Sequence, residues 1–258
     1  MPRLDQKTVR NRLLALMPEQ AFARIASHLS FVDMPQGMII AEPEQRISHV
    51  YFPERGMVSM VAVSRDGQEV ESGVFGRDGV GSTAAILGVE SAPNRLNMQI
   101  AGDGWRIERT LLADAVQEDA PLRNILLLYV QTLIVQATYT ALANAVHQVE
   151  VRLARWLLMS DDRSDTGELM LTHHFLSVML AVRRPSVTNA LHTLEGRGFI
   201  RAERGCIRIR DRPALENFAG DAYGQAEATY EKLIGPLRVK ISQSASPPAP
   251  SDREHLGA

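Results

Sequence analysis

The first 110 residues change from a helical to a strand-like spacing of apolar positions. Between residues 9 and 30 the apolar residues recur every three or four positions, which predicts two short helices separated near Pro18. Over residues 31–109 they occur in short runs interrupted by the turn sequences PQG, PERG, RDGQ, GRDG and GDG. This spacing predicts a small antiparallel β-roll of about eight strands. A hairpin turn is expected at Arg65-Asp66-Gly67-Gln68.

One long helix is predicted over residues 119–147. Asp119 can cap it, Pro121 suits its first turn, and no glycine or proline follows before its end. Its apolar positions form two stripes: Leu122, Leu126, Tyr129, Leu133 and Gln136 in one, and Ile125, Leu128, Thr132, Val135, Tyr139, Leu142 and Val146 in the other. Two stripes predict two partners, the β-roll and the same helix of a second subunit. The alternative is a helix buried wholly inside one subunit. On the dimer interpretation, charging the seam by Leu133→Glu should give monomers.

The rest of the chain alternates between helical and strand-like patterns. After a hinge at residues 147–148 come an amphipathic helix, the loop SDDRSDTG and a short strand in GELMLT. Two helices follow, then FIRAERGCIRIR, which alternates and turns at Arg204-Gly205 like a β-hairpin, and a last helix over residues 213–237. The Ser- and Pro-rich end is typical of a disordered tail. The predicted units are residues 1–118, 119–147, 148–237 and 238–258, in an α+β fold.

The order helix, tight turn, helix and β-hairpin is that of a winged helix-turn-helix. HHFLSVML forms the first helix, Ala181 and Val182 the turn, and residues 184–195 the second helix, with Arg183 and Arg184 at its N-terminus. Its inward positions are Val187, Ala190, Leu191 and Leu194, and its outward positions are Ser186, Thr188, Asn189 and His192. A recognition helix enters the major groove N-terminus first, where arginine can bind guanine and asparagine can bind adenine. The paired arginines are therefore in the position that DNA recognition needs.

The charge distribution favours the same interpretation. The chain has a net charge of −2, but residues 171–212 carry eight arginines against three acidic residues, a balance of +5. This block contains no lysine, and the arginine fork suits phosphate and guanine. A basic segment on an acidic body is typical of proteins that bind a polyanion. The alternative is a solvated charged surface.

The stretch LTHHFLSVMLAVRRPSVTNALHTLEGRGFIRAERGCIRIRD resembles the DNA-binding domain of Crp/Fnr-family bacterial transcription regulators. The preceding roll and long helix are similar to the family's cyclic-nucleotide-binding-type (jelly-roll) sensor domain and dimerisation helix. The resemblance implies a homodimer that binds double-stranded DNA at half-sites about one helical turn apart. The DNA-binding residues it implies are Arg183, Arg184, Ser186, Thr188, Asn189, His192 and Arg204.

Two positions depart from the family pattern in this part. The family's base-contacting positions fall on Arg184, Pro185 and Asn189, and proline cannot make the side-chain contact usual there. The preferred DNA sequence should therefore differ from that of the best-known members. Ala181 replaces the usual turn glycine, which is tolerable only if this residue avoids positive φ.

The resemblance also implies an effector site in the roll, with Gly81, Ser82, Arg95, Leu96 and Thr138 at the corresponding positions. In members that bind cyclic AMP, a glutamate binds the ribose where this chain has Ser82, and a small hydroxyl residue stands where it has Leu96. Loss of that glutamate should weaken nucleotide binding by roughly tens- to a hundredfold. The effector is then a cyclic nucleotide bound weakly, another small molecule, or none.

Other functions find little support in the sequence. The single cysteine, Cys206, excludes an internal disulfide and an iron–sulfur cluster. The roll holds one histidine, His49, so no metal site is expected, and we find no nucleophile motif or phosphate loop, so the chain should not be an enzyme. No uninterrupted run of 18 apolar residues predicts a membrane span, and we expect a cytoplasmic protein. RNA polymerase is an expected partner, through an acidic loop with Asp161, Asp162 and Asp165. A dimeric adaptor that does not bind DNA remains the alternative.

Overall fold

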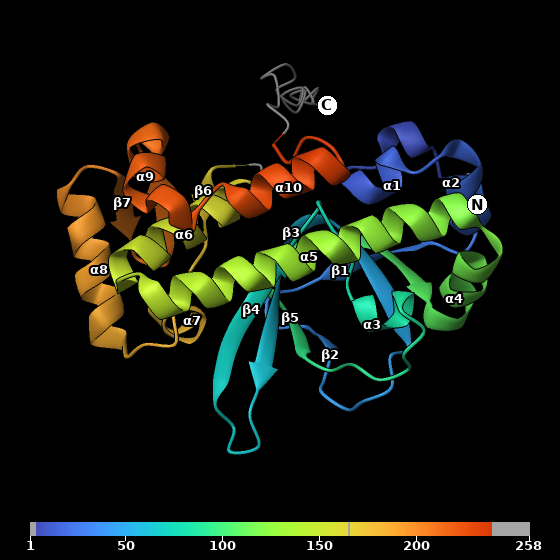
Figure 1. Ribbon diagram of the computed structural model, residues 1–258, viewed down its shortest axis with the longest axis horizontal. Coiled ribbons are helices and arrows are strands. Elements are labelled where there is room, and N and C mark those ends of the chain that lie inside the picture. Colours follow the sequence, from blue (N-terminus) through green and yellow to red (C-terminus); the bar gives the residue numbers. More distant parts are fainter. Residues whose placement is uncertain (1–3, 165, 239–258) are drawn as a thin grey trace, which may run out of the picture.

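The computed structural model describes residues 4–164 and 166–238. The tail predicted beyond residue 238 lies outside the described residues. A β-roll with short helices lies at one end of the molecule and a small helical domain at the other, and a long helix, α5, runs past the roll to reach that domain (Figure 1). The fold is α+β, as the pattern predicted.

The N-terminal segment consists of η1 (Gln6–Thr8), α1 (Arg12–Leu16) and α2 (Glu19–Ala26), so the predicted break at Pro18 is confirmed. The Asn11 side chain accepts from Leu14 N at 3.2 Å and donates to the carbonyl oxygens of Pro53 and Gly79 at 2.9 and 2.8 Å. One buried amide therefore caps α1 and fastens it to the roll.

The roll is antiparallel and contains β1 (Ser30–Met34), β2 (Ile39–Ala41), β3 (His49–Val63), β4 (Glu69–Phe75) and β5 (Arg95–Glu108), with α3 (Thr83–Ile86) and α4 (Arg109–Glu118) beside it. The order is β1-β5-β3-β4, with β2 also paired to β5. The described part of the chain thus has five roll strands where the pattern predicted about eight. The difference arises because β3 and β5 are 15 and 14 residues long and continue through bends at which their register shifts.

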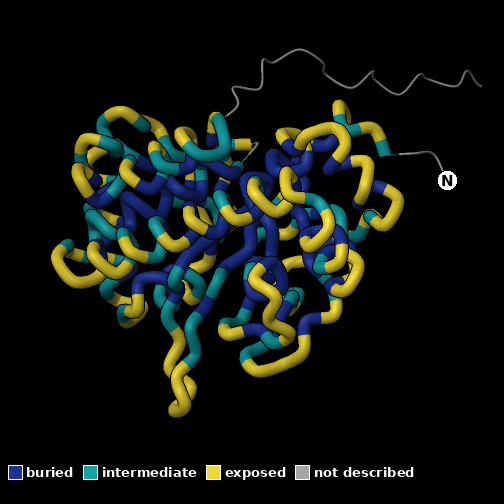
Figure 2. The backbone as a smooth tube through the Cα atoms, turned by 45° about the vertical axis from the view of Figure 1, so that its right-hand side comes forward, coloured by how far each residue is buried: buried dark blue, intermediate teal, exposed yellow. Residues whose placement is uncertain are grey.

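Local features of the roll agree with its sequence. The turn at residues 65–68 is confirmed, with Ser64 N donating to Gln68 O at 2.8 Å and Gly67 at a φ of 76°. The hairpin that it closes, between β3 and β4, projects from the body and is exposed at its tip (Figure 2). At the bend, a Cβ on Gly102 would overlap the Arg55 carbonyl, so only glycine lets β5 approach β3 this closely.

Helix α5 (Ala120–Val146) begins with the Asp119 carboxylate accepting from Leu122 N at 2.8 Å and ends at the predicted hinge. The stripe from Leu122 to Gln136 is buried against the roll, and the Gln136 amide bonds to Val74 N and O at 2.7 and 3.1 Å. Gln136 thereby pairs one backbone N–H and one backbone carbonyl on the free edge of β4. Leu133 belongs to this buried stripe and is 8% exposed, so Leu133→Glu is the wrong substitution for testing a dimer.

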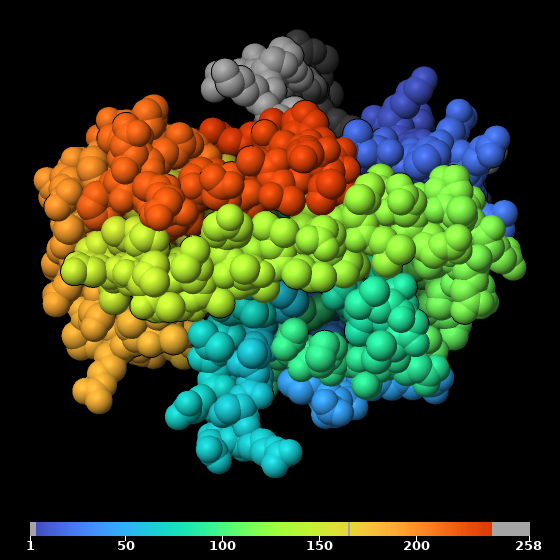
Figure 3. Space-filling view, in the orientation of Figure 1, coloured from blue at the N-terminus to red at the C-terminus, as the bar shows by residue number. Residues whose placement is uncertain are grey.

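The outward apolar side chains of α5 are Leu127, Ile134, Leu142 and Val146, which are 43–63% exposed. This face is partly offset from the predicted second stripe, in which Thr132 is 5% exposed and Leu142 is 46% exposed. By length and composition alone α5 could cross a membrane, with a mean hydropathy of 1.6. Its buried stripe on the roll shows instead that one side of the helix belongs to a protein core. Figure 3 shows the other side crossing the surface of the molecule.

The C-terminal part contains α6 (Val149–Asp161), β6 (Glu168–Leu169), α7 (His173–Met179), α8 (Arg184–Gly196), β7 (Ile200–Glu203), β8 (Cys206–Ile209), α9 (Arg212–Ala219), η2 (Gly220–Ala222) and α10 (Gln225–Leu233). The strands form a small sheet in the order β6-β8-β7. The single helix predicted over residues 213–237 is wrong: the chain turns at Gly220 and Gly224, which have φ values of 54° and 108°. After this turn α10 lies along α5, and Tyr230 and Leu237 join the apolar core of the roll.

Candidate nucleic-acid interface

Helix α7, the turn and helix α8 form the predicted helix-turn-helix. The Thr172 hydroxyl caps α7 by accepting from Phe175 N at 3.2 Å. Val182 N donates to Ser177 O at 3.0 Å across the turn, and Pro185 occupies the first turn of α8. Gly198, at a φ of 77°, ends α8 with Phe199 N donating to Leu194 O at 3.1 Å. Helix α8 is therefore fixed at both ends.

The turn contains an unexpected backbone conformation. Ala181 has a φ of 48°, so the condition under which alanine was judged tolerable at this position is not met. Alanine in the left-handed region costs about 1–2 kcal/mol. The hydrogen bonds on either side of the turn, from Leu180 N to Leu176 O and from Val182 N to Ser177 O, both 3.0 Å long, hold it there.

The inward face of α8 is confirmed. Val187, Ala190, Leu191 and Leu194 are at most 3% exposed and pack in one cluster with residues of α6, α7 and the small sheet. This cluster fixes the rotation of α8 about its own axis. It therefore decides which side chains point outward.

The outward face presents the residues predicted to bind DNA. Arg183, Arg184, Asn189 and His192 are exposed, and Ser186 and Thr188 are half-buried. Within the described part of the chain, neither arginine forms a side-chain hydrogen bond or ion pair. Thr188 is partly used internally, since its hydroxyl donates to Arg184 O at 3.2 Å and lies 3.3 Å from His173 Nδ1. The N-terminal end of α8 thus carries two available guanidinium groups.

The wing, β7 and β8, adds Arg204 at its exposed tip beside Gly205, which has a φ of 77°. Its other arginines are engaged: Arg208 binds Glu168 at 2.6 Å, and Arg201 lies 3.6 Å from Glu203. Arg197 lies over the Phe218 ring at 4.8 Å. The basic block is therefore less available to a polyanion than its composition suggested.

Arg212 is the clearest case of a structural arginine. Its guanidinium binds Asp162 at 2.6 Å and Glu216 at 2.7 Å and also pairs with Asp161, while its side chain is 13% exposed. Burial raises the pKa of Asp162, against the charge of Arg212. The carboxylates of Asp161 and Asp162 are both bound to Arg212 in this network. The expectation that they form an acidic loop for RNA polymerase is therefore wrong for these two residues. Asp165 lies outside the described residues.

The five residues expected to bind an effector do not lie around one cavity. Gly81 is buried, and Ser82 and Leu96 are each 5% exposed; the two latter line a space of about 20 Å³ together with Phe75 and Leu133. Such a volume holds about one water molecule. The Ser82 hydroxyl has no hydrogen-bond partner within the described residues.

The other two effector residues lie elsewhere. Arg95 points away from this space and binds Glu42 at 3.0 Å and also Glu69, while Thr138 is exposed and donates to Ile134 O at 2.9 Å. The alternation along β5 explains this, since Leu96 points into the roll and Arg95 points out of it.

A buried polar cluster that the sequence analysis missed joins the roll to α7. The Ser59 hydroxyl lies 2.6 Å from Glu71 Oε2 and 2.9 Å from Gln99 Oε1, and Gln99 Nε2 lies 2.8 Å from Met179 Sδ. Burial raises the pKa of the Glu71 carboxyl well above its ordinary value. One hydroxyl proton cannot serve both acceptors, and a neutral Glu71 resolves this because it donates to Ser59 while Ser59 donates to Gln99.

Metal ligands do not gather anywhere in the described ranges, in which no three His, Cys, Asp or Glu side chains could hold an ion together. The residues predicted to bind DNA offer guanidinium, amide, imidazole and hydroxyl groups on α8 and the wing.

Comparisons with known proteins agree with this geometry. Residues 151–218 match the family model of the Crp-like helix-turn-helix domain. A Crp/Fnr-family regulator from Eubacterium rectale is 20% identical, with a TM-score of 0.62 over 80% of this chain and 97% of that one. FixK2 from Bradyrhizobium japonicum is 20% identical, with a TM-score of 0.63 over 74% and 98%.

A third solved structure adds a relative with a stated effector. CLP from Xanthomonas campestris, described as a c-di-GMP responsive global regulator, is 18% identical, with a TM-score of 0.60 over 75% of this chain and 100% of that one. These structures share the fold of this chain. A search of curated proteins finds no match.

Proposed function

We propose that this chain, a Crp/Fnr-family regulator by its Crp-like helix-turn-helix domain and its fold, binds double-stranded DNA as a homodimer with α8 in the major groove. The protein regulates transcription and is not an enzyme. The observation that carries the proposal is the N-terminal end of α8, where Arg183 and Arg184 are exposed while the opposite face is fixed in the core. An α-helix presented end-on in this way fits the major groove.

The side chains on the outward face divide into two roles. Arg184 and Asn189 lie on the exposed side of α8 and have the chemistry to bind guanine and adenine edges. Arg183 and His192, with Ser186, Thr188 and the wing residue Arg204, contact phosphates and set the register. Pro185 contributes no hydrogen bond, so one base position in each half-site is left without the contact usual in the family.

The dimer is proposed to form through α5. The outward apolar face of α5, defined above by Leu127, Ile134, Leu142 and Val146, would be covered by the same face of a second copy. Exposed apolar residues in a row along one helix mark an interaction site. The two-fold symmetry of this pair would place two α8 helices on successive turns of DNA.

An effector is proposed to act through the roll, as in the family. The surroundings of Ser82 and Leu96 do not favour cyclic AMP, because no carboxylate is among the described residues that line this space and Arg95 is paired with Glu42 and Glu69. CLP, which shares this fold, is described as responsive to c-di-GMP, and this supports an effector of some kind for the present chain. Regulation by cyclic AMP of the standard type is the second candidate, supported by Gly81 and Arg95 at the family's positions. A regulator of this type acts in the cytoplasm and contacts RNA polymerase.

DNA binding by fluorescence anisotropy tests the proposal. A site selected from a random pool is titrated at two salt concentrations, with and without cyclic AMP. We expect tight, salt-sensitive and sequence-selective binding that is independent of the nucleotide. Binding that appears only with cyclic AMP would favour the second candidate. Arg46→Ala, which removes an exposed arginine from the roll, is the control for Arg184→Ala. If the wild type shows no selective binding and neither variant differs from it, an adaptor that does not bind DNA is favoured.

A further inference from the structure

Glu71 is a buried carboxyl that forms no ion pair within the described residues. It is 3% exposed, whereas the equally buried carboxylate of Asp78 binds Arg163 at 2.8 Å. Glu71 lies instead 2.6 Å from the Ser59 hydroxyl, which is also 2.9 Å from Gln99 Oε1. The protonation of Glu71 is therefore coupled to the hydrogen bonds of uncharged neighbours.

The proton on Glu71 decides which side of the Gln99 amide faces α7. When Glu71 carries the proton it donates to Ser59, and Ser59 donates to Gln99 Oε1. Gln99 Nε2 then donates to Met179 Sδ, 2.8 Å away. Without the proton, Ser59 must donate to Glu71, so Gln99 has to turn its amide and donate Nε2 to Ser59. The amide oxygen then lies against the Met179 sulfur, and two acceptors repel each other at this distance.

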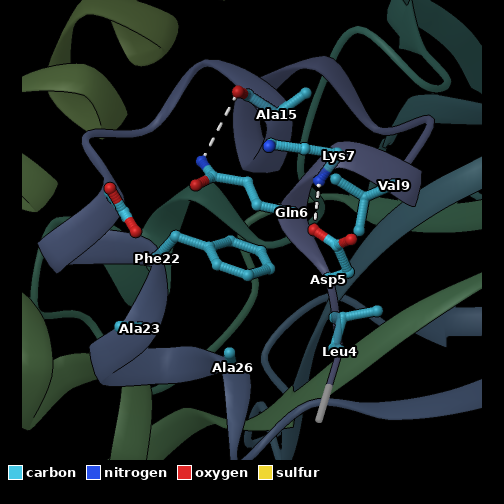
Figure 4. A pocket seen from close by; sticks show the side chains of 10 residues that line it. Leu4, Asp5, Gln6, Lys7, Val9, Ala15, Phe22, Ala23 and Ala26 are labelled. Carbon is cyan, nitrogen blue, oxygen red and sulfur yellow. Dashed lines mark hydrogen bonds between the residues drawn. The ribbon is translucent and has the colours of Figure 1, made fainter.

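A second glutamine shows how an amide is fixed when its partners do not titrate. The Gln6 amide, beside α1, donates to three backbone carbonyls, one of which is that of Ala15 (Figure 4). Backbone carbonyls accept at every pH, so this amide keeps one orientation. Gln99 has a hydroxyl and a thioether as its neighbours instead. Its orientation consequently follows the proton on Glu71.

The charges around Glu71 do not keep it ionised. Burial raises the pKa of its carboxyl well above the ordinary value, and the Ser59 hydroxyl lowers it by less. The charges of Arg155 in α6 and Arg163 just after α6 also lower the pKa, as does the Trp156 side chain. Together these effects leave the pKa raised, so burial and the hydrogen-bond geometry both favour a neutral Glu71.

A cavity of about 170 Å³ gives Glu71 access to protons. It is lined by Glu71 and by Met179 of α7, and its volume holds several water molecules, so the carboxyl can exchange its proton without unfolding. The other titratable groups that line it are Glu69, Arg95 and His174. Arg95 pairs with Glu69, and His174 is exposed on α7. Because histidine side chains change their charge in the physiological pH range, a test needs a control at His174.

We propose that Gln99 is a proton-sensitive latch between the roll and α7, set by Glu71. With a proton on Glu71, the Gln99 N–H holds Met179; without it, the Gln99 oxygen opposes the sulfur and loosens α7. Helix α7 is the first helix of the helix-turn-helix and packs against α8. The latch therefore couples pH to the attachment of the helix-turn-helix to the roll. It is separate from the effector position beside Ser82 and does not depend on DNA binding.

Hydrogen exchange of the full chain tests the latch, measured by mass spectrometry on the amides of residues 173–180 between about pH 5 and 9 and corrected for the intrinsic rate. We expect the protection of α7 to fall by about three- to tenfold as Glu71 loses its proton. Glu71→Gln should show no such fall, because its amide donates to Ser59 at every pH. Met179→Leu should show none either, because it removes the sulfur. His174→Gln is the matched control and should behave as the wild type does.

Three results would overturn the proposal. They are protection of α7 that does not change across this range in the wild type, a fall that persists in Glu71→Gln, and a fall that is lost in His174→Gln. A second measurement needs no variant of the carboxyl. In protein with isotope-labelled methionine methyl groups, the signal of Met179 is identified by its absence in Met179→Leu and should shift with the same midpoint as the protection. A signal that does not move with pH would refute the latch even if Glu71→Gln fails to fold.

Discussion

The outward face of α5 allows a sharp test of the dimer through two adjacent residues with opposite environments. Ile134 is 54% exposed in the single chain, whereas Leu133 is 8% exposed and packs on the roll. About half of the Ile134 side chain is left to bury in a dimer, which is worth about 1 kcal/mol per copy. In the Ile134→Glu variant both copies lose this burial free energy. Two like charges also meet across the two-fold axis, which costs at least about 2 kcal/mol more. The dissociation constant of the dimer should rise by about a thousandfold or more.

Sedimentation velocity over a range of protein concentrations measures this change. Ile134→Glu should sediment as a monomer with an unchanged circular dichroism spectrum and urea midpoint at low concentration. Leu133→Ala is the matched control and should lower the free energy of unfolding by about 2–5 kcal/mol while leaving association intact. A dimeric Ile134→Glu, or a monomeric Leu133→Ala that is still folded, would refute the assignment of the two faces of α5.

Three further predictions concern α8, its turn and the buried carboxyl. Arg184→Ala should weaken DNA binding by about 1–3 kcal/mol and relax selectivity at one base position, measured by anisotropy on single-base variants of the site; equal losses on all sequences would mean that it contacts only phosphate. Ala181→Gly should raise the free energy of unfolding by about 0.5–1 kcal/mol in urea, because glycine removes the cost of positive φ but adds freedom to the unfolded chain; a loss of stability would contradict this. Burial raises the pKa of Glu71, so the folded protein keeps a proton that the unfolded chain releases near pH 4.5. The free energy of unfolding should therefore fall as the pH rises from about 4.5 towards the pKa of Glu71 in the folded protein. Glu71→Gln should flatten this fall in urea unfolding measured across pH, and an unchanged slope would show that Glu71 is ionised.

The parts of the fold that depend on local patterns could be predicted from the sequence. The break at Pro18, the hairpin at Gly67 and the extent of α5 follow from turn and capping chemistry, which acts within a few residues. The inward face of α8 follows from helical periodicity. For the same reason the sequence was sufficient to recognise the helix-turn-helix, whose side chains are arranged by one short segment.

The parts that depend on distant contacts could not be predicted. Nothing local distinguishes Arg212, which binds Asp161 and Asp162 at the C-terminal end of α6, from the exposed Arg204 eight residues earlier. The charge balance of residues 171–212 counted both alike. The positive φ of Ala181 also comes from its surroundings, because the packing of α7 against α8 fixes a turn that alanine alone would avoid.

A bulge in β4 explains how the two ends of this strand can serve two different sites. Strict alternation would place Glu71 and Phe75 on the same face of the sheet. Gly73 instead pairs with Met60 and Glu71 with Val61, which leaves Ser72 as an extra residue. Phe75 consequently points into the roll beside Ser82, while Glu71 points out towards α7.

The position of β4 ties the proposed effector site to the recognition helix. Phe75 lines the small space beside Ser82, and Glu71 lines a cavity of about 170 Å³ that is also lined by Phe175 and Met179 of α7. Helix α7 in turn packs against α8. A ligand that needs more room than the 20 Å³ beside Ser82 must displace residues that line this space, and Phe75 and Leu133 are two of the large ones. Displacement of Phe75 moves β4, to which α7 is attached, and displacement of Leu133 moves α5, which carries the proposed dimer face. In the proposed dimer, either movement would change the relative orientation of the two α8 helices, and we therefore expect a ligand that enlarges this space by either route to change the affinity for DNA.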